Sequence, residues 1–174
     1  MKREQVRRTP GIRLRPMEEA DLGQVVALER AAFAKPWPRE QFVRELTLPF
    51  SRSVVACRPD ARRVVLGYSV RWLVAGEIEL LNLAVVRKQR MRGIGRILVR
   101  SLLSEALRER ASLVGLEVSI HNRKARKLYE SLGFIAVRQR RNYYAAGDHA
   151  VVMEWRPDPE SRPGIRLTRR STSP

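Results

Sequence analysis

Hydrophobic positions along the chain repeat with two different periods, and together these predict a mixed α and β fold. Apolar residues recur three or four positions apart in residues 17–33, 39–48, 93–110 and 123–132, as on one face of a helix. Alternating or continuous apolar runs predict strands at 11–16, 53–57, 64–74, 77–86, 113–120, 134–140 and 150–155. Antiparallel strands come first and strand–helix–strand units follow, so we expect one α+β (α/β three-layer) domain around a twisted sheet.

Two residues mark details of the helices. Glu29 falls close to the apolar stripe of the helix at 17–33, which leaves the orientation of that helix open. Gly133 follows the helix at 123–132, where a left-handed cap is expected.

The chain of 174 residues is expected to form a single domain with short extensions. We assign residues 1–10 to a basic N-terminal extension, 11–156 to the domain, and 157–174 to an Arg/Pro/Ser-rich tail that we expect to be disordered. No apolar run approaches the ~18 residues of a membrane helix, and the N-terminus does not resemble a signal peptide. The single cysteine, Cys57, and two separated histidines favour a cytoplasmic protein without disulfides, membrane contact or metal.

The net charge of +17 suggests an anionic partner. Arginine supplies 30 of the 35 basic residues, however, and such a bias can also arise from genomic codon usage. Residues 1–16 carry +5 and residues 156–174 carry +3, so about half of the excess lies on the domain itself. Weak electrostatic contact with a ribosome or RNA is therefore an expected accessory property.

A glycine-containing turn, Arg90-Met91-Arg92-Gly93-Ile94-Gly95, separates a buried strand from an amphipathic helix. Such a turn lets backbone N–H groups converge on an anion at a helix N-terminus. It is neither a dinucleotide-binding fingerprint, because Leu98 stands where a third glycine is needed, nor a Walker loop. The alternative is a simple strand-to-helix turn with solvated arginines.

Five further positions carry candidate chemistry. Glu117 interrupts an apolar strand, where burial would raise its pKa toward that of a base active at neutral pH; an exposed-face glutamate is the alternative. Asn122 and Tyr129 lie two helical turns apart on one face, and could also be a helix cap and a core aromatic. Tyr143 and Tyr144 could be ordinary strand aromatics.

The combination of these motifs resembles the GNAT superfamily of N-acetyltransferases. The matching segments are R-x-x-G-x-G, LEVSIHNRKARKLYESLGF and RRNYY, with Ala32-Phe33, Pro36-Trp37 and residues 81–85 upstream. The resemblance extends from Ile12 to Trp155, and within the superfamily it is to the RimI-like ribosomal-protein-alanine N-acetyltransferases.

The resemblance implies a mostly antiparallel mixed sheet with about four flanking helices, in which two parallel strands splay to admit acetyl-CoA. The residues that would hold acetyl-CoA are Leu83, Ala84 and Val85 along the pantetheine arm, Met91, Arg92, Gly93, Ile94, Gly95 and Arg96 at the pyrophosphate, and Asn122.

The resemblance also implies roles at the reacting centre. Glu117 matches the general base, and Tyr129 matches the tyrosine that protonates the departing thiolate. The residues that would flank the peptide entrance are Phe33, Trp37, Tyr143 and Tyr144. One departure from the family pattern is His149, which stands next to Ala150 where an acidic residue is common, and it affects the detail of the peptide-side hairpin.

The expected reaction is direct, metal-free transfer of an acetyl group to the N-terminal α-amine of a protein, with ribosomal proteins that begin with alanine as the favoured acceptors. An α-amine has a pKa of about 7.7–8.0, against about 10.4 for lysine, so part of it is already neutral at neutral pH. Two alternatives stay open: acetylation of lysine side chains or small amines, and a basic RNA- or ribosome-binding module.

Overall fold

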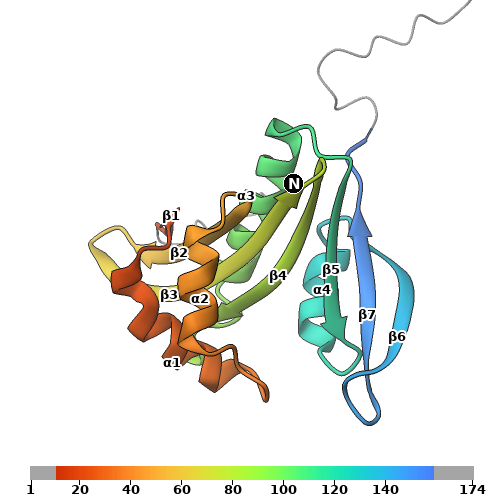
Figure 1. The fold of residues 1–174 in the computed structure, drawn as a ribbon, viewed down its shortest axis with the longest axis horizontal. Helices are drawn as coiled ribbons and strands as arrows, with labels where there is room; N and C mark the ends of the chain where they lie inside the picture. The colour runs from red at the N-terminus through yellow and green to blue at the C-terminus, as the bar shows by residue number, and fades with distance from the viewer. Residues whose placement is uncertain (1–10, 159–174) are drawn as a thin grey trace, which may run out of the picture.

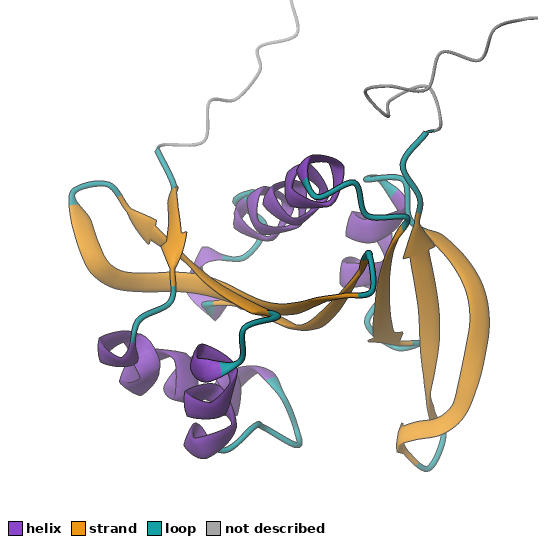
Figure 2. Ribbon diagram, turned by 45° about the horizontal axis from the view of Figure 1, so that its top comes forward, coloured by secondary structure: helices purple, strands orange, loops and turns teal. Residues whose placement is uncertain are grey.

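A computed structural model describes residues 11–158, which form one seven-stranded sheet with helices on both faces (Figure 1). Helices α1 and α2 cover one face, whereas α3 and α4 lie on the other (Figure 2). The assignments made for residues 1–10 and for most of the tail lie outside the described residues.

The observed elements match the expected ones in number and order. The strands are β1 (Arg13–Pro16), β2 (Ser51–Arg58), β3 (Ala61–Val74), β4 (Glu77–Val85), β5 (Leu113–Ser119), β6 (Ile135–Ala145) and β7 (Asp148–Trp155). The helices are α1 (Leu22–Ala32), α2 (Arg39–Thr47), α3 (Ile94–Arg108) and α4 (Arg123–Glu130), with 3-10 turns at Glu19–Asp21 and Arg87–Gln89.

Strand order across the sheet is β1-β2-β3-β4-β5-β7-β6, and only the β4–β5 pair is parallel. That pair holds for four residue pairs, from Glu77↔Leu113 to Leu80↔Leu116, and then ends. Beyond it β4 and β5 diverge, which Figure 1 shows as a widening gap between the two ribbons. The fold class and the splayed parallel strands expected from the sequence are confirmed.

A β-bulge in β4 changes which face its residues present. Val70 pairs with Asn82 and Arg71 with Leu80, so Leu81 has no partner on β3. Before the bulge, Leu80 packs in the core beneath α3; after it, Asn82 faces α1. Without the extra residue, strand alternation would point Asn82 toward α3.

Apolar side chains fill both faces of the sheet. On the α1–α2 side the largest buried groups include Leu22, Phe42 and Tyr68. On the α3–α4 side the core continues from Leu102 to Met153 on β7. The division into two faces follows from the 3.6-residue and two-residue periods seen in the sequence.

Three elements show the main differences from the expected bounds. The helix expected at 17–33 begins as an α-helix only at Leu22, because Asp21 accepts the backbone N–H of Glu18 and pairs with Arg15 through both carboxylate oxygens at 2.7 Å. Strands β6 and β7 extend to a tight turn at Ala146 and Gly147, beyond the expected 134–140 and 150–155. Every residue of β6 except Tyr144 is exposed, and residues 141–145 carry no apolar alternation, so the sequence predicted only the first part of this strand.

Candidate active site

The gap between β4 and β5 is the centre of the candidate site. Residues 83–85 are still paired to β3, at Ser69, Tyr68 and Gly67. The strand edge that faces β5 has no ladder partner past Leu80, so the backbone groups pointing into the gap can bond a ligand. A free strand edge of this kind suits an extended chain that carries its own amides.

The glycine turn lies at the C-terminal end of β4 and begins α3. Gly93 is the N-cap of this 15-residue helix and has a φ of 85°, a conformation that side-chain-bearing residues rarely adopt. Arg90 Nε donates to the carbonyl of Val85 at 3.0 Å, which fixes the turn to the end of the strand. The first amides of α3 have no partner within the helix, so they are free to meet an anion.

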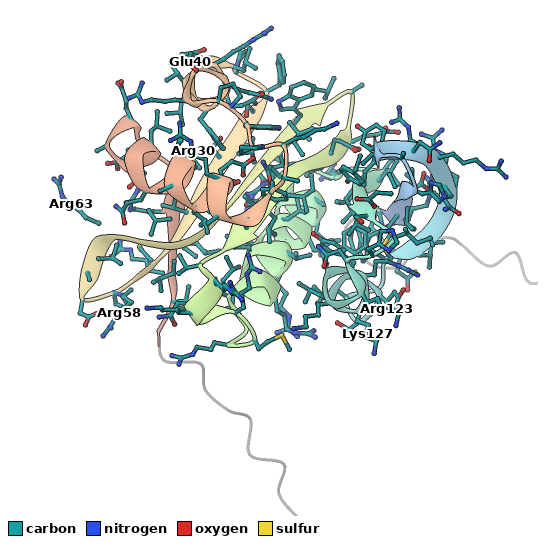
Figure 3. All side chains as sticks on the ribbon, turned by 90° about the horizontal axis from the view of Figure 1, so that it is seen from below. Arg30, Glu40, Arg58, Arg63, Arg123 and Lys127 are labelled. Atoms are coloured by element: carbon teal, nitrogen blue, oxygen red, sulfur yellow. The ribbon has the colours of Figure 1, made fainter. Side chains whose placement is uncertain are left out.

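Basic side chains occur in this turn and on helix α4. Arg96 donates to Ser131 Oγ at 2.8 Å and so links α3 to α4. Arg123 and Lys127 extend outward from α4 and are exposed (Figure 3). A Cβ on Gly95 would lie 3.3 Å from Leu128, so this glycine lets α3 and α4 pack closely.

Glu117 lies on β5 where the gap opens, on the face opposite the α3–α4 core. Its side chain is 18% exposed, and Arg140 Nη1 donates to its Oε1 at 2.5 Å. The sequence left a buried carboxylate and an exposed-face glutamate as alternatives. In the structure the Glu117 side chain is partly buried, and a cation contacts its carboxylate.

Both tyrosines of β6 approach this carboxylate. A hydrogen bond with Glu117 raises the pKa of Tyr143. Burial raises the pKa of Tyr144, and the charge of Glu117 raises it further. The two rings meet edge to face at 5.0 Å, and Arg140 lies 4.4 Å over the Tyr143 ring. The structure thus brings Glu117 together with three groups that lie more than 20 residues away in the sequence.

Tyr129 and Asn122 lie on α4, next to the gap. Tyr129 is 7% exposed and packs on Phe134, and burial raises its pKa to about 12, so the phenol keeps its proton at neutral pH. Asn122 is the helix N-cap: its Oδ1 accepts the N–H of Ala125 at 3.2 Å. The capping role considered from the sequence is confirmed, and the cofactor role stays a prediction.

The loop between α1 and α2 borders the site from the other side. Phe33 is 38% exposed, and Trp37 packs on Phe42 with ring centroids 5.5 Å apart. Among residues 11–158, neither aromatic makes a hydrogen bond or ring contact with Glu117. Their role in peptide binding stays a prediction.

His149 occupies the position where the sequence departs from the family pattern. Its Nδ1 accepts the backbone N–H of Asn142 at 2.9 Å. Asn142 has a φ of 52°, and its Oδ1 accepts the N–H of Gly147 at 3.0 Å. His149 therefore holds the backbone of Asn142, the residue that directly precedes Tyr143, in place.

A second carboxylate near the gap was missed in the sequence. Glu79 pairs with Gly115 across the parallel ladder, and a Cβ on Gly115 would lie 2.5 Å from Glu79 Oε2. Partial burial raises the pKa of Glu79, and the charges of Glu117 and Glu77 raise it further. Glu79 lies beside Glu117 only because β4 and β5 pair in this parallel register. The residue pattern of a single strand does not reveal how that strand pairs with its neighbour.

Comparison with known proteins places this geometry in a family. A model of the acetyltransferase (GNAT) family matches residues 22–134, and the chain belongs to that family. It is RimI-like: it is 34% identical over 152 residues to the N-alpha-acetyltransferase RimI of Mycobacterium tuberculosis, covering 83% of this chain and 92% of that protein. It is 31% identical over 143 residues to the ribosomal protein bS18-alanine N-acetyltransferase of Escherichia coli, covering 79% and 92%. These relatives identify the chain as an N-acetyltransferase that acts on protein N-termini.

Solved structures agree with this assignment. The crystal structure of the ribosomal-protein-S18-alanine N-acetyltransferase from Escherichia coli superposes with a TM-score of 0.76 at 27% identity, covering 84% of this chain and 94% of that one. Arabidopsis thaliana NAA60 in complex with acetyl-CoA has the same fold, with a TM-score of 0.76 at 21% identity over 84% and 98% of the two chains. Within residues 11–158, no helix is long and apolar enough to cross a membrane.

Proposed function

We propose that this enzyme transfers the acetyl group of acetyl-CoA to the N-terminal α-amine of a ribosomal protein that begins with alanine. The observation that carries the proposal is the early end of the β4–β5 ladder at Leu80↔Leu116. That end opens a gap with a helix N-terminus at one side and a carboxylate and a buried phenol at its walls.

The residues around the gap fit acetyl-CoA. The free backbone edge of Leu83, Ala84 and Val85 would hold the pantetheine amides, and the turn from Met91 to Arg96 would hold the pyrophosphate. Asn122 would add a contact from the start of α4. When bound, acetyl-CoA supplies a thioester whose carbonyl carbon accepts an amine.

Three groups of the chain would act on protons and charge. Glu117 takes a proton from the acceptor amine, directly or through a water molecule. The backbone N–H of Val85 donates to the oxygen that becomes negative during transfer. Tyr129, whose pKa of about 12 keeps it protonated, gives its proton to the departing sulfur.

The acceptor would enter from the side of the α1–α2 loop and the β6–β7 hairpin. Phe33 and Trp37 lie on one side of this entrance, and Tyr143 and Tyr144 on the other. Arg140 pairs with Glu117 in the structure. The acceptor ammonium, when it binds at Glu117, would therefore replace the Arg140 guanidinium as the cation that contacts this carboxylate. The preference for alanine is inferred from the two bS18-specific relatives in Bacillus subtilis and Escherichia coli. Since ribosomal proteins are made in the cytoplasm, we place the enzyme there.

The test uses the purified chain, acetyl-CoA and three versions of one short peptide. The first has a free N-terminal alanine, the second a blocked N-terminus with an internal lysine, and the third a free N-terminus with a bulky first residue. We expect mass spectrometry to find rapid acetylation of the first peptide alone. Faster acetylation of the blocked lysine peptide would contradict the proposal and favour a lysine acetyltransferase.

A further inference from the structure

A buried carboxylate on α1 has no part in the proposed chemistry. Glu29, the charge that interrupts the apolar stripe of the first helix, is 1% exposed. No ion pair involves it among residues 11–158. Burying an unpaired charge is unfavourable unless strong hydrogen bonds compensate for the lost water.

Three donors from three different segments satisfy Glu29. Its Oε1 accepts the backbone N–H of Trp37 at 2.9 Å and Nδ2 of Asn82 at 3.0 Å. Its Oε2 accepts the hydroxyl of Tyr68. An apolar side chain would fill this place in the helix stripe without any of these demands, so packing alone does not explain the carboxylate.

The segments that Glu29 joins are the two sides of the candidate site. Trp37 belongs to the loop of residues 33–38, which we name the acceptor loop. Asn82 directly precedes residues 83–85, the strand edge that faces the gap. The bulge at Leu81 turns Asn82 toward α1, and only in this orientation does its side chain reach Glu29.

Aromatic contacts extend the same connection. The Trp37 ring packs on Phe42 at 5.5 Å, and Phe42 meets Tyr68 edge to face at 5.6 Å. The hydroxyl of Tyr68 in turn donates its hydrogen bond to Glu29. The acceptor loop is thus held at its backbone by the carboxylate and at its indole by the aromatic side chains.

We infer that Glu29 is a positioning residue that holds the acceptor loop at a fixed place relative to the strand edge of β4, and so sets the affinity for the acceptor peptide. The inference rests on the proposed function, because that function identifies the acceptor peptide as the ligand of the loop. Glu29 does not touch the reacting atoms. Its loss should weaken acceptor binding and leave acetyl-CoA binding unchanged.

Two substitutions divide the effects of charge and of hydrogen bonding. Glu29→Gln keeps the shape of the side chain and one carbonyl oxygen. Its amide N–H₂ group, however, would face one of the groups that donates a hydrogen bond to Glu29. Glu29→Leu removes every acceptor and leaves the Trp37 N–H unsatisfied. We expect the acceptor KM to rise about tenfold in Glu29→Gln and more in Glu29→Leu, since bonds to a charged group are lost.

Glu45 supplies a matched control. It is a 4% exposed carboxylate on α2 that also has no ion pair among the described residues, and it accepts from Ser51 Oγ and Trp72 Nε1, each at 2.7 Å. Neither of these hydrogen-bond partners belongs to the acceptor loop or to β4. Glu45→Gln should lower the unfolding temperature as Glu29→Gln does, while its acceptor KM stays within twofold of the wild type.

The closing experiment combines three measurements on the full-length proteins. Steady-state kinetics gives KM for the alanine peptide and for acetyl-CoA, thermal unfolding reports stability, and amide hydrogen exchange reports the Trp37 N–H without any acceptor. We expect faster Trp37 exchange and a raised peptide KM in the Glu29 variants only. Unchanged exchange and KM in folded Glu29→Gln would overturn the inference, as would equal changes in Glu45→Gln. A wild type that acetylates no free N-terminus would instead refute the proposed function, and the exchange result would still decide the anchoring role.

Discussion

At the scale of single residues, the candidate chemistry depends on one carboxylate and one phenol held in contrasting surroundings. Glu117 is 18% exposed and contacts Arg140, whereas Tyr129 is buried and keeps its proton. A carboxylate that a substrate can reach and a phenol that stays protonated are the two kinds of group that general acid–base catalysis needs.

Substituting either residue tests this assignment. We expect Glu117→Gln and Tyr129→Phe each to lower kcat by about 10²–10⁴, the range for loss of acid–base catalysis. Glu154→Gln is the matched control, because Glu154 is paired with Gly115 on the same face and bonds Arg156 instead of a substrate. Steady-state rates with the alanine peptide measure all three, and full activity of either variant would remove its assigned role.

Glu79 gives a prediction about stability and pH. Its pKa is raised in the folded state, so the folded protein disfavours the ionised form more than the unfolded chain does. Glu79→Gln should therefore be more stable than the wild type at pH 7, and this advantage should vanish as the pH falls below the ordinary value of 4.5.

Thermal unfolding from pH 4 to pH 8 measures the difference between the two proteins. Glu19→Gln is the control, since the Glu19 side chain is 76% exposed and its contact with Arg39 is 3.5 Å long. A wild type more stable than Glu79→Gln at pH 7 would show that Glu79 makes a favourable contact that outweighs its repulsion.

At the scale of elements, the turn between β4 and α3 combines a strained backbone with a binding role. Gly93 has a φ of 85° and Gly76, in the β3–β4 turn, has a φ of 75°. Alanine at either position should lower the free energy of unfolding by a similar amount, about 1–2 kcal/mol. Only Gly93→Ala should also weaken the binding of acetyl-CoA, because only Gly93 lies at the N-terminus of α3.

Chemical denaturation and calorimetric titration of acetyl-CoA separate these two effects. Equal acetyl-CoA affinity in both glycine variants would argue that the turn is structural and that the phosphates bind elsewhere.

Sequence periodicity was sufficient to predict the elements that have one apolar and one polar face, such as α3 and β5. It predicted the start of β6 but not its extension through residues 141–145, which carry no alternation. Glu29 looked like an error in a helix stripe, because its partner Asn82 is 53 residues away and is turned toward it only by a bulge. Local patterns identify the groups that carry chemistry, whereas partners set by tertiary register have no local signal.

At the scale of the whole molecule, positive charge is spread over the exterior. Arg30, Arg58 and Arg63 lie on one side of the molecule and Arg123 and Lys127 on the other (Figure 3). The C-terminal segment adds four arginines, at 162, 166, 169 and 170. Contact with RNA would then be weak, general and sensitive to salt.

Replacing those four arginines with serine in the full-length chain tests where RNA contact arises. We expect the slope of log affinity against log salt for a short single-stranded RNA to fall by up to about 3, since each lost contact removes about 0.7. Peptide acetylation at moderate salt should not change. A slope equal to that of the wild type would assign RNA contact to the folded body, and Arg30→Ser with Arg63→Ser is the control for general loss of charge.

The four residue pairs between β4 and β5 have a consequence for how long the enzyme survives. They join a half built from β1–β4 to a half built from β5–β7, so a short parallel seam lies beside the candidate catalytic groups. A ligand lodged there would bridge both halves and lower the rate of local opening. Proteolytic lifetime would then follow the supply of acetyl-CoA, and a starved cell would clear idle copies of the enzyme faster than working ones.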